Sequence, residues 1–104
     1  MEYRIHPKTG DKISVIGVGT GPIFEAPERE AAAALTYAYE HGVNYLDFAT
    51  AGAGTFPYVG VALGSVRREL FYQIHFGANY ESGEYGWPTN LDTIKRQVDW
   101  QLKE

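Results

Sequence analysis

The sequence predicts an α/β fold in which a β-hairpin is followed by three strand–helix units whose strands form a parallel sheet. Short extended runs alternate along the 104 residues with segments of helical periodicity. This alternation is typical of a parallel sheet that is covered by helices. The units repeat at intervals of about 30 residues, which is the length of a βαβ crossover. No linker interrupts them, so residues 1–104 are expected to form a single domain.

The first two extended runs form the predicted hairpin. Tyr3–Ile5 and residues 12–16 flank a turn signal at residues 8–11, which includes a glycine. The second run continues into residues 17–22, where glycines follow an apolar stretch. This pattern favours a buried parallel strand that enters a loop.

The first helix is expected to start at Pro27, because the missing N–H of proline costs nothing at the first helical position. His41 lies in its last turn, and Gly42 is a natural residue to end it. Residues 43–48 then form the second predicted parallel strand. An apolar stripe at helical spacing is expected to face the sheet and comprises Ala31, Ala34, Leu35 and Ala38.

The remaining elements are a loop, a short helix, a strand and a last helix. Residues 49–57 are mostly small and are expected to form the loop, and residues 58–63 form the short helix, which Gly64 ends. Residues 70–76 form the third predicted parallel strand. Thr89 or Asn90 can cap the last helix. One face of this helix is lined by Leu91, Ile94, Val98 and Leu102.

Composition excludes several classes of function. The net charge is −4 and no cluster of Lys and Arg occurs, so binding to nucleic acid or to an anionic membrane is not expected. The sequence has no cysteine, which excludes disulfides and thiolate sites. His6, His41 and His75 are too scattered to indicate a metal site. A cytoplasmic location is the default expectation, because no apolar run has the length of a signal peptide or a membrane span.

Several segments, in order, resemble the opening of aldo-keto reductases. Tyr3–Arg4, Lys8–Gly10 and residues 14–20 resemble the start of that family. His41-Gly42-Val43-Asn44-Tyr45-Leu46-Asp47 resembles its second strand and active-site aspartate, and residues 60–69 resemble the next helix and turn. The resemblance implies a partial (β/α)8 TIM barrel, truncated to a hairpin and three βα units. It also implies descent from NAD(P)-dependent carbonyl oxidoreductases.

Two departures from the family pattern bear on activity. Gly52 stands where the resemblance places the catalytic tyrosine, and His75 stands where it places a lysine. A divergent branch of the family has a histidine in a similar strand. The family's later catalytic histidine and phosphate-binding loops have no counterpart in these residues. We therefore expect that the short chain is not an active reductase by itself, and whether it is an enzyme stays open.

Four residues are predicted to contribute to a site. Asp47 and His75 lie near the ends of neighbouring strands, where a carboxylate–imidazole pair could act as a general acid and base. Alternatively, Asp47 caps the following loop and His75 is hydrogen-bonded within the sheet. By resemblance, Gly19 and Thr20 line the pocket for NADP or NAD, although the same segment could be a tight strand-to-loop turn.

The other predicted function is an interaction module. A three-unit sheet has two edges and an apolar face that need cover, so a homo-oligomer or a partner chain is expected. An aromatic stretch precedes the last helix and could anchor a ligand or partner, or cover a sheet edge; it contains Tyr80, Tyr85 and Trp87.

Overall fold

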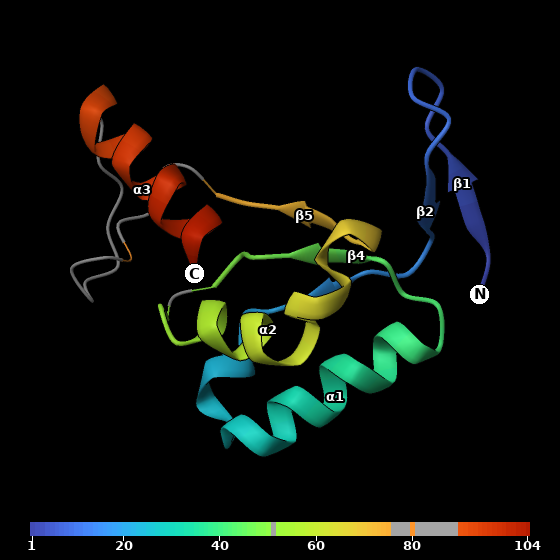
Figure 1. The fold of residues 1–104 in the computed structure, drawn as a ribbon, viewed down its shortest axis with the longest axis horizontal. Helices are drawn as coiled ribbons and strands as arrows, with labels where there is room; N and C mark the ends of the chain where they lie inside the picture. The colour runs from blue at the N-terminus through green and yellow to red at the C-terminus, as the bar shows by residue number, and fades with distance from the viewer. Residues whose placement is uncertain (51, 76–79, 81–89) are drawn as a thin grey trace.

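The described part of the computed structural model comprises residues 1–50, 52–75, 80 and 90–104. It has the predicted α/β architecture, with a two-stranded antiparallel hairpin and a three-stranded parallel sheet of order β3-β4-β5 among these residues. Helices α1 (Glu28–Glu40) and α2 (Thr55–Leu63) lie together on one side of the sheet (Figure 1). Helix α3 (Leu91–Lys103) lies beyond the end of β5. The predicted partial barrel is therefore confirmed at the level of fold.

Strands β1 (Tyr3–Ile5) and β2 (Lys12–Ser14) form the predicted hairpin. The expectation that β2 runs on into the parallel strand is wrong, because β3 (Val18–Gly19) is a separate strand. The reason is local: the Ser14 hydroxyl donates to the Ile16 carbonyl at 2.7 Å, and such side-chain bonds compete with a strand ladder.

Asn44 joins the hairpin to the parallel sheet. Its Oδ1 accepts from the Ser14 amide at 2.8 Å, and its Nδ2 donates to the Lys12 carbonyl at 2.8 Å. The Asn44 backbone amide in turn donates to the Ser14 hydroxyl oxygen at 3.1 Å. One side chain therefore fixes the position of the hairpin relative to the start of β4 (Tyr45–Asp47).

The register of the parallel strands divides their side chains between two faces. Leu46 of β4 pairs with Val18 and with Tyr72 of β5 (Phe71–Gln73), and all three pack in the core beneath the helices. Since successive side chains alternate in a strand, Asp47 and Gln73 lie on the opposite face, on which none of the described helices packs. The open face is thus partly polar rather than broadly apolar as expected.

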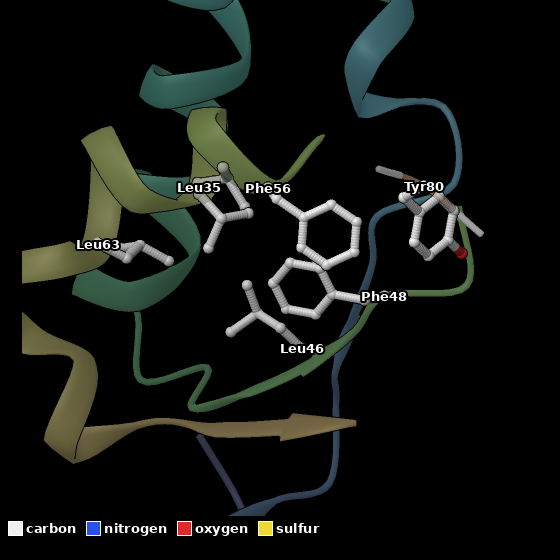
Figure 2. Close-up of a cluster of buried hydrophobic side chains, with 7 residues drawn as sticks. Leu35, Leu46, Phe48, Phe56, Leu63 and Tyr80 are labelled. Carbon is white, nitrogen blue, oxygen red and sulfur yellow. The ribbon is translucent and has the colours of Figure 1, made fainter. Parts of the chain in front are cut away.

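The core is a cluster between the sheet and the helices (Figure 2). The Phe48 and Phe56 rings stack with centroids 5.1 Å apart, and Trp100 of α3 meets Phe56 edge-on at 5.2 Å. These contacts connect the residue that follows β4 with α2 and α3. The buried apolar members of this cluster are Leu35, Leu46, Phe48, Phe56, Val59, Leu63 and Tyr80.

Helix α1 begins one residue later than predicted, with Pro27 at the N-cap. Ala31 and Leu35 are buried as expected, but Ala34 is exposed. The buried face is rotated toward Tyr39, which packs against the core and donates to Glu69 at 2.7 Å. This bond to the carboxylate is the main cause that raises the pKa of Tyr39, and desolvation is the second cause.

Gly42 ends α1 in a conformation that other residues rarely adopt, with φ at 88°. A Cβ atom there would also lie 2.7 Å from the Tyr3 hydroxyl. We expect Gly42→Ala to lower the free energy of unfolding by about 1–2 kcal/mol, measured by urea denaturation. Gly64 is the matched control, because its φ is −57° and a Cβ atom there meets nothing within 4 Å. Equal losses in Gly42→Ala and Gly64→Ala would contradict this account.

The expected loop at residues 49–57 is too long, because α2 already begins at Thr55 and places Pro57 in its first turn. Proline is tolerated in that turn. The predicted end of α2 is confirmed, because the α-helix ends at Leu63 with Gly64 as its C-cap. A 3-10 helix then follows over Gly64–Glu69. Burial of Val59 explains why a weak helix former is accepted in α2.

Helix α3 has the predicted Asn90 cap, whose side chain accepts from the amides of Asp92 and Thr93 at 3.0 and 3.1 Å. Thr89, the alternative cap, lies outside the described residues. No helix among the described residues has the length and apolar character needed to cross a membrane.

The predicted apolar face of α3 is only partly correct. Ile94 and Val98 are half-buried, but Leu91 and Leu102 are 61% and 48% exposed while Gln97 and Gln101 are buried. The two glutamines face inward because backbone groups there need partners. Gln97 accepts from the Tyr80 amide at 3.0 Å. The Gln101 side chain donates to the His75 backbone carbonyl, with a donor–acceptor distance of 3.3 Å.

Candidate active site

The parallel sheet brings the two predicted catalytic side chains together. Asp47 is the last residue of β4, and His75 lies two residues beyond the last residue of β5. The His75 Nε2 atom is 2.9 Å from the Asp47 Oδ1 atom. Their side chains are 30% and 34% exposed, so the pair is sheltered but reachable from solvent. The contact is the juxtaposition that a catalytic role requires, and the role itself stays a prediction.

The chemistry of the pair assigns the proton between them. An ionised carboxylate only accepts hydrogen bonds, so the Nε2 atom of His75 must carry the proton that it shares with Asp47. The Nδ1 atom is then the nitrogen that can gain or lose a proton. An imidazole can therefore exchange a proton at one nitrogen while the other keeps its hydrogen bond to the carboxylate.

Two further side chains belong to the same polar cluster and were not predicted. Gln73 donates from Nε2 to the Asp47 Oδ1 atom at 3.2 Å, and the Tyr45 hydroxyl donates to the Gln73 Oε1 atom. Both were detectable from strand alternation, because each stands two residues before a predicted site residue and therefore shares its face.

The two predicted cofactor residues lie in different environments. Thr20 is fully buried, and its hydroxyl donates to the Asp47 carbonyl at 3.0 Å, so this side chain ties the loop after β3 to β4. Gly19 is exposed on the open face and pairs in register with Asp47; a Cβ atom there would meet nothing within 4 Å. Of these two residues, Gly19 is therefore the one that offers free surface beside Asp47 and His75.

An open hollow of about 400 Å³ adjoins Asp47 on the side of β3. Its floor includes Gly17 and Gly19, which have no side chains to fill it, and Tyr45 stands beside them. The hairpin supplies the remaining wall through Ile13, Ser14 and Val15. A flat group could therefore approach the carboxylate from this side.

The position of the missing tyrosine is blocked in this structure. A Cβ atom on Gly52 would lie 2.5 Å from the Phe24 ring, so any larger residue at position 52 requires that ring to move. The loop around it is held by Thr50, whose hydroxyl accepts from the Gly52 amide at 3.2 Å. Phe24 thus occupies space next to the position from which the family's tyrosine would project.

The described residues contain no group of three or more His, Asp or Glu side chains that could hold a metal ion. Tyr85 and Trp87 of the predicted aromatic stretch lie outside the described residues. Tyr80 is buried, and its hydroxyl donates to the Thr50 carbonyl at 2.6 Å, so this member of the stretch packs inward.

No protein-family model matches the chain. Its fold matches that of an aldo-keto reductase from Bacillus halodurans in its holo form, with a TM-score of 0.77 and 24% identity over 99% of this chain and 36% of that one. Two structures from Pseudomonas aeruginosa, provisionally assigned as aldo-keto reductases, match with TM-scores of 0.76 and 0.70 at 27% identity. These cover 97% of this chain and 40% and 41% of those chains.

The chain therefore spans between about a third and two fifths of the length of these structures. Coverage of nearly the whole chain by part of a longer barrel is consistent with the N-terminal part of an aldo-keto reductase, as the resemblance predicts. The likeness supports descent from such proteins.

Proposed function

We propose that this chain, which has the fold of part of an aldo-keto reductase, belongs to a cytoplasmic NAD(P)-dependent carbonyl oxidoreductase in which Asp47 and His75 transfer a proton. The observation that carries the proposal is the 2.9 Å bond between His75 Nε2 and Asp47 Oδ1. It lies at the carboxyl ends of neighbouring parallel strands, where barrel enzymes hold their catalytic groups.

The proposed step is the reduction of a carbonyl group to an alcohol. A nicotinamide cofactor supplies the hydride to the carbonyl carbon when it is bound. His75, in its cationic form, gives the proton on Nδ1 to the carbonyl oxygen and becomes neutral. Asp47 holds the ring in place through Nε2 and stabilises the cation before transfer. His75 thereby takes the role of the family's catalytic tyrosine, whose position is occupied by Gly52 in this chain.

The fit of the cofactor to these residues is partial. The open surface at Gly19 and the hollow beside Asp47 suit a flat nicotinamide ring, whereas Thr20 cannot present its buried hydroxyl. We therefore assign contact with the ring to Gly19 and a supporting role to Thr20. We assign the binding of the cofactor's phosphates to another part of the protein or to a partner.

Calorimetric titration of NADPH and NADH into the protein tests this proposal. Saturable binding at micromolar strength is expected for one of them. Gly19→Val should weaken binding about tenfold or more, because its side chain fills open surface. Gly64→Ala is the matched control and should bind as the parent does, since position 64 lies on the far side of the sheet among the helices. No binding up to millimolar cofactor would contradict the proposal.

A homo-oligomeric interaction module is the second candidate. The observation in its favour is the exposed apolar side of α3, where Leu91 and Leu102 face away from the core. Light scattering on the samples used for calorimetry distinguishes the candidates. A stable dimer without cofactor binding supports the module, whereas cofactor binding by a monomer supports the reductase.

A further inference from the structure

Gln73 occupies the centre of the polar cluster on the open face. It pairs in register with Asp47 across β4 and β5, and its side chain spans from the Asp47 carboxylate to the Tyr45 hydroxyl. Gln73 itself is exposed and contributes nothing to the core beneath the helices. Both of its side-chain bonds are therefore directed along the open face.

The chemistry of an amide fixes the direction of these bonds. A carboxylate can only accept, so the Gln73 NH2 group must face Asp47 and its carbonyl oxygen must face Tyr45. Tyr45 then donates its own proton to Gln73. The Tyr45 ring packs closely against the backbone of Gly17. A Cβ atom built on Gly17 would lie 2.6 Å from the Tyr45 ring.

The Asp47 Oδ1 atom accepts two hydrogen bonds, one from Gln73 at 3.2 Å and one from His75 at 2.9 Å. An oxygen with two lone pairs is saturated by two donors. The two donors come from the last residue of β5 and from the residue two positions beyond it. A rotation of the Asp47 carboxylate that moves Oδ1 therefore breaks both bonds. Gln73 thus restricts the carboxylate to the orientation that His75 requires.

We infer that Gln73 is a positioning residue that locks Asp47 toward His75 and engages the Tyr45 hydroxyl so that it does not compete as a proton donor. The inference rests on the proposed proton-transfer pair. It adds a residue that has no place in the resemblance described above. A long side chain is held here by two directed bonds, although ordering it costs rotamer freedom.

Exchange of the His75 Nε2–H proton with solvent, followed by NMR at low temperature, tests the inference without any need for turnover. In Gln73→Leu, this exchange should be about threefold faster or more, because Asp47 leaves its position more often. Tyr45→Phe removes one hydroxyl and should accelerate exchange less, because the amide keeps its bond to Asp47. Asp99→Asn is the matched control on the exposed side of α3 and should exchange as the parent does.

The outcomes separate this inference from the function on which it rests. Unchanged exchange in a folded Gln73→Leu would overturn the role of Gln73. If that variant does not fold, an unchanged rate in Tyr45→Phe would overturn it instead. A protected Nε2–H in the parent with faster exchange in both variants supports it. If the parent has no protected Nε2–H, the proposed pair fails, and the role of Gln73 falls with it.

Discussion

If the proposed reductase function holds, Asp47→Asn is expected to reduce carbonyl turnover by about 10²- to 10⁴-fold, the usual contribution of a general acid–base unit. Asparagine keeps the shape of the side chain and its oxygen can still accept from His75. It removes the charge that stabilises the cationic imidazole, so the proton donor is lost while the geometry is retained. Steady-state kinetics with NADPH and a carbonyl substrate measures the loss.

Stability and assembly should not change in this variant, because Asp47 is one-third exposed and packs outside the core. Asp99→Asn makes the same chemical change on the exposed side of α3 and should leave turnover unaltered. Turnover that survives in Asp47→Asn would show that another group donates the proton. Loss of assembly in this variant would show that Asp47 is structural.

Phe56→Ala should lower the free energy of unfolding by about 3–5 kcal/mol, the range for removal of a buried aromatic ring. Phe56 is 3% exposed, and its ring lies within 5.2 Å of the rings of Phe48, Tyr80 and Trp100. These contacts connect α2 to the sheet and to α3. The free energy of unfolding of a native domain is only about 5–15 kcal/mol. The variant should therefore be close to unfolding at room temperature.

Leu91→Ala is the matched control for this loss, because Leu91 is also apolar but 61% exposed. Its effect in urea denaturation should stay within about 0.5 kcal/mol. A similar loss for Leu91→Ala would mean that the apolar side of α3 is covered in solution, as the oligomeric candidate requires. A small loss for Phe56→Ala would contradict the packing in Figure 2.

The order of the elements could be predicted because it depends on local signals. The turn around Gly10, the C-terminal Gly42 and the Asn90 cap each act through the backbone of a few residues. The boundaries of helices and strands that depend on tertiary contacts could not be predicted from the sequence. Helix α2 starts early because Thr55 and Phe56 are buried, and this burial is not visible in a run of small residues.

The candidate site shows the same division. Asp47 and His75 could be predicted to meet because parallel strands bring their carboxyl ends to one edge of the sheet. The inward glutamines of α3 could not, since their burial depends on which backbone groups elsewhere need partners. Periodicity favoured the leucines instead, and the structure leaves those exposed.

The most direct test of the central claim is an NMR measurement of the ring nitrogens of His75 at neutral pH, in the parent protein and in Asp47→Ala. The structure predicts a protonated, slowly exchanging Nε2 in the parent, with the protection lost when the carboxylate is removed. An Nε2 atom without a proton in the parent, or equal Nε2–H exchange in the two proteins, would contradict the claim that Asp47 and His75 form a proton-transfer pair.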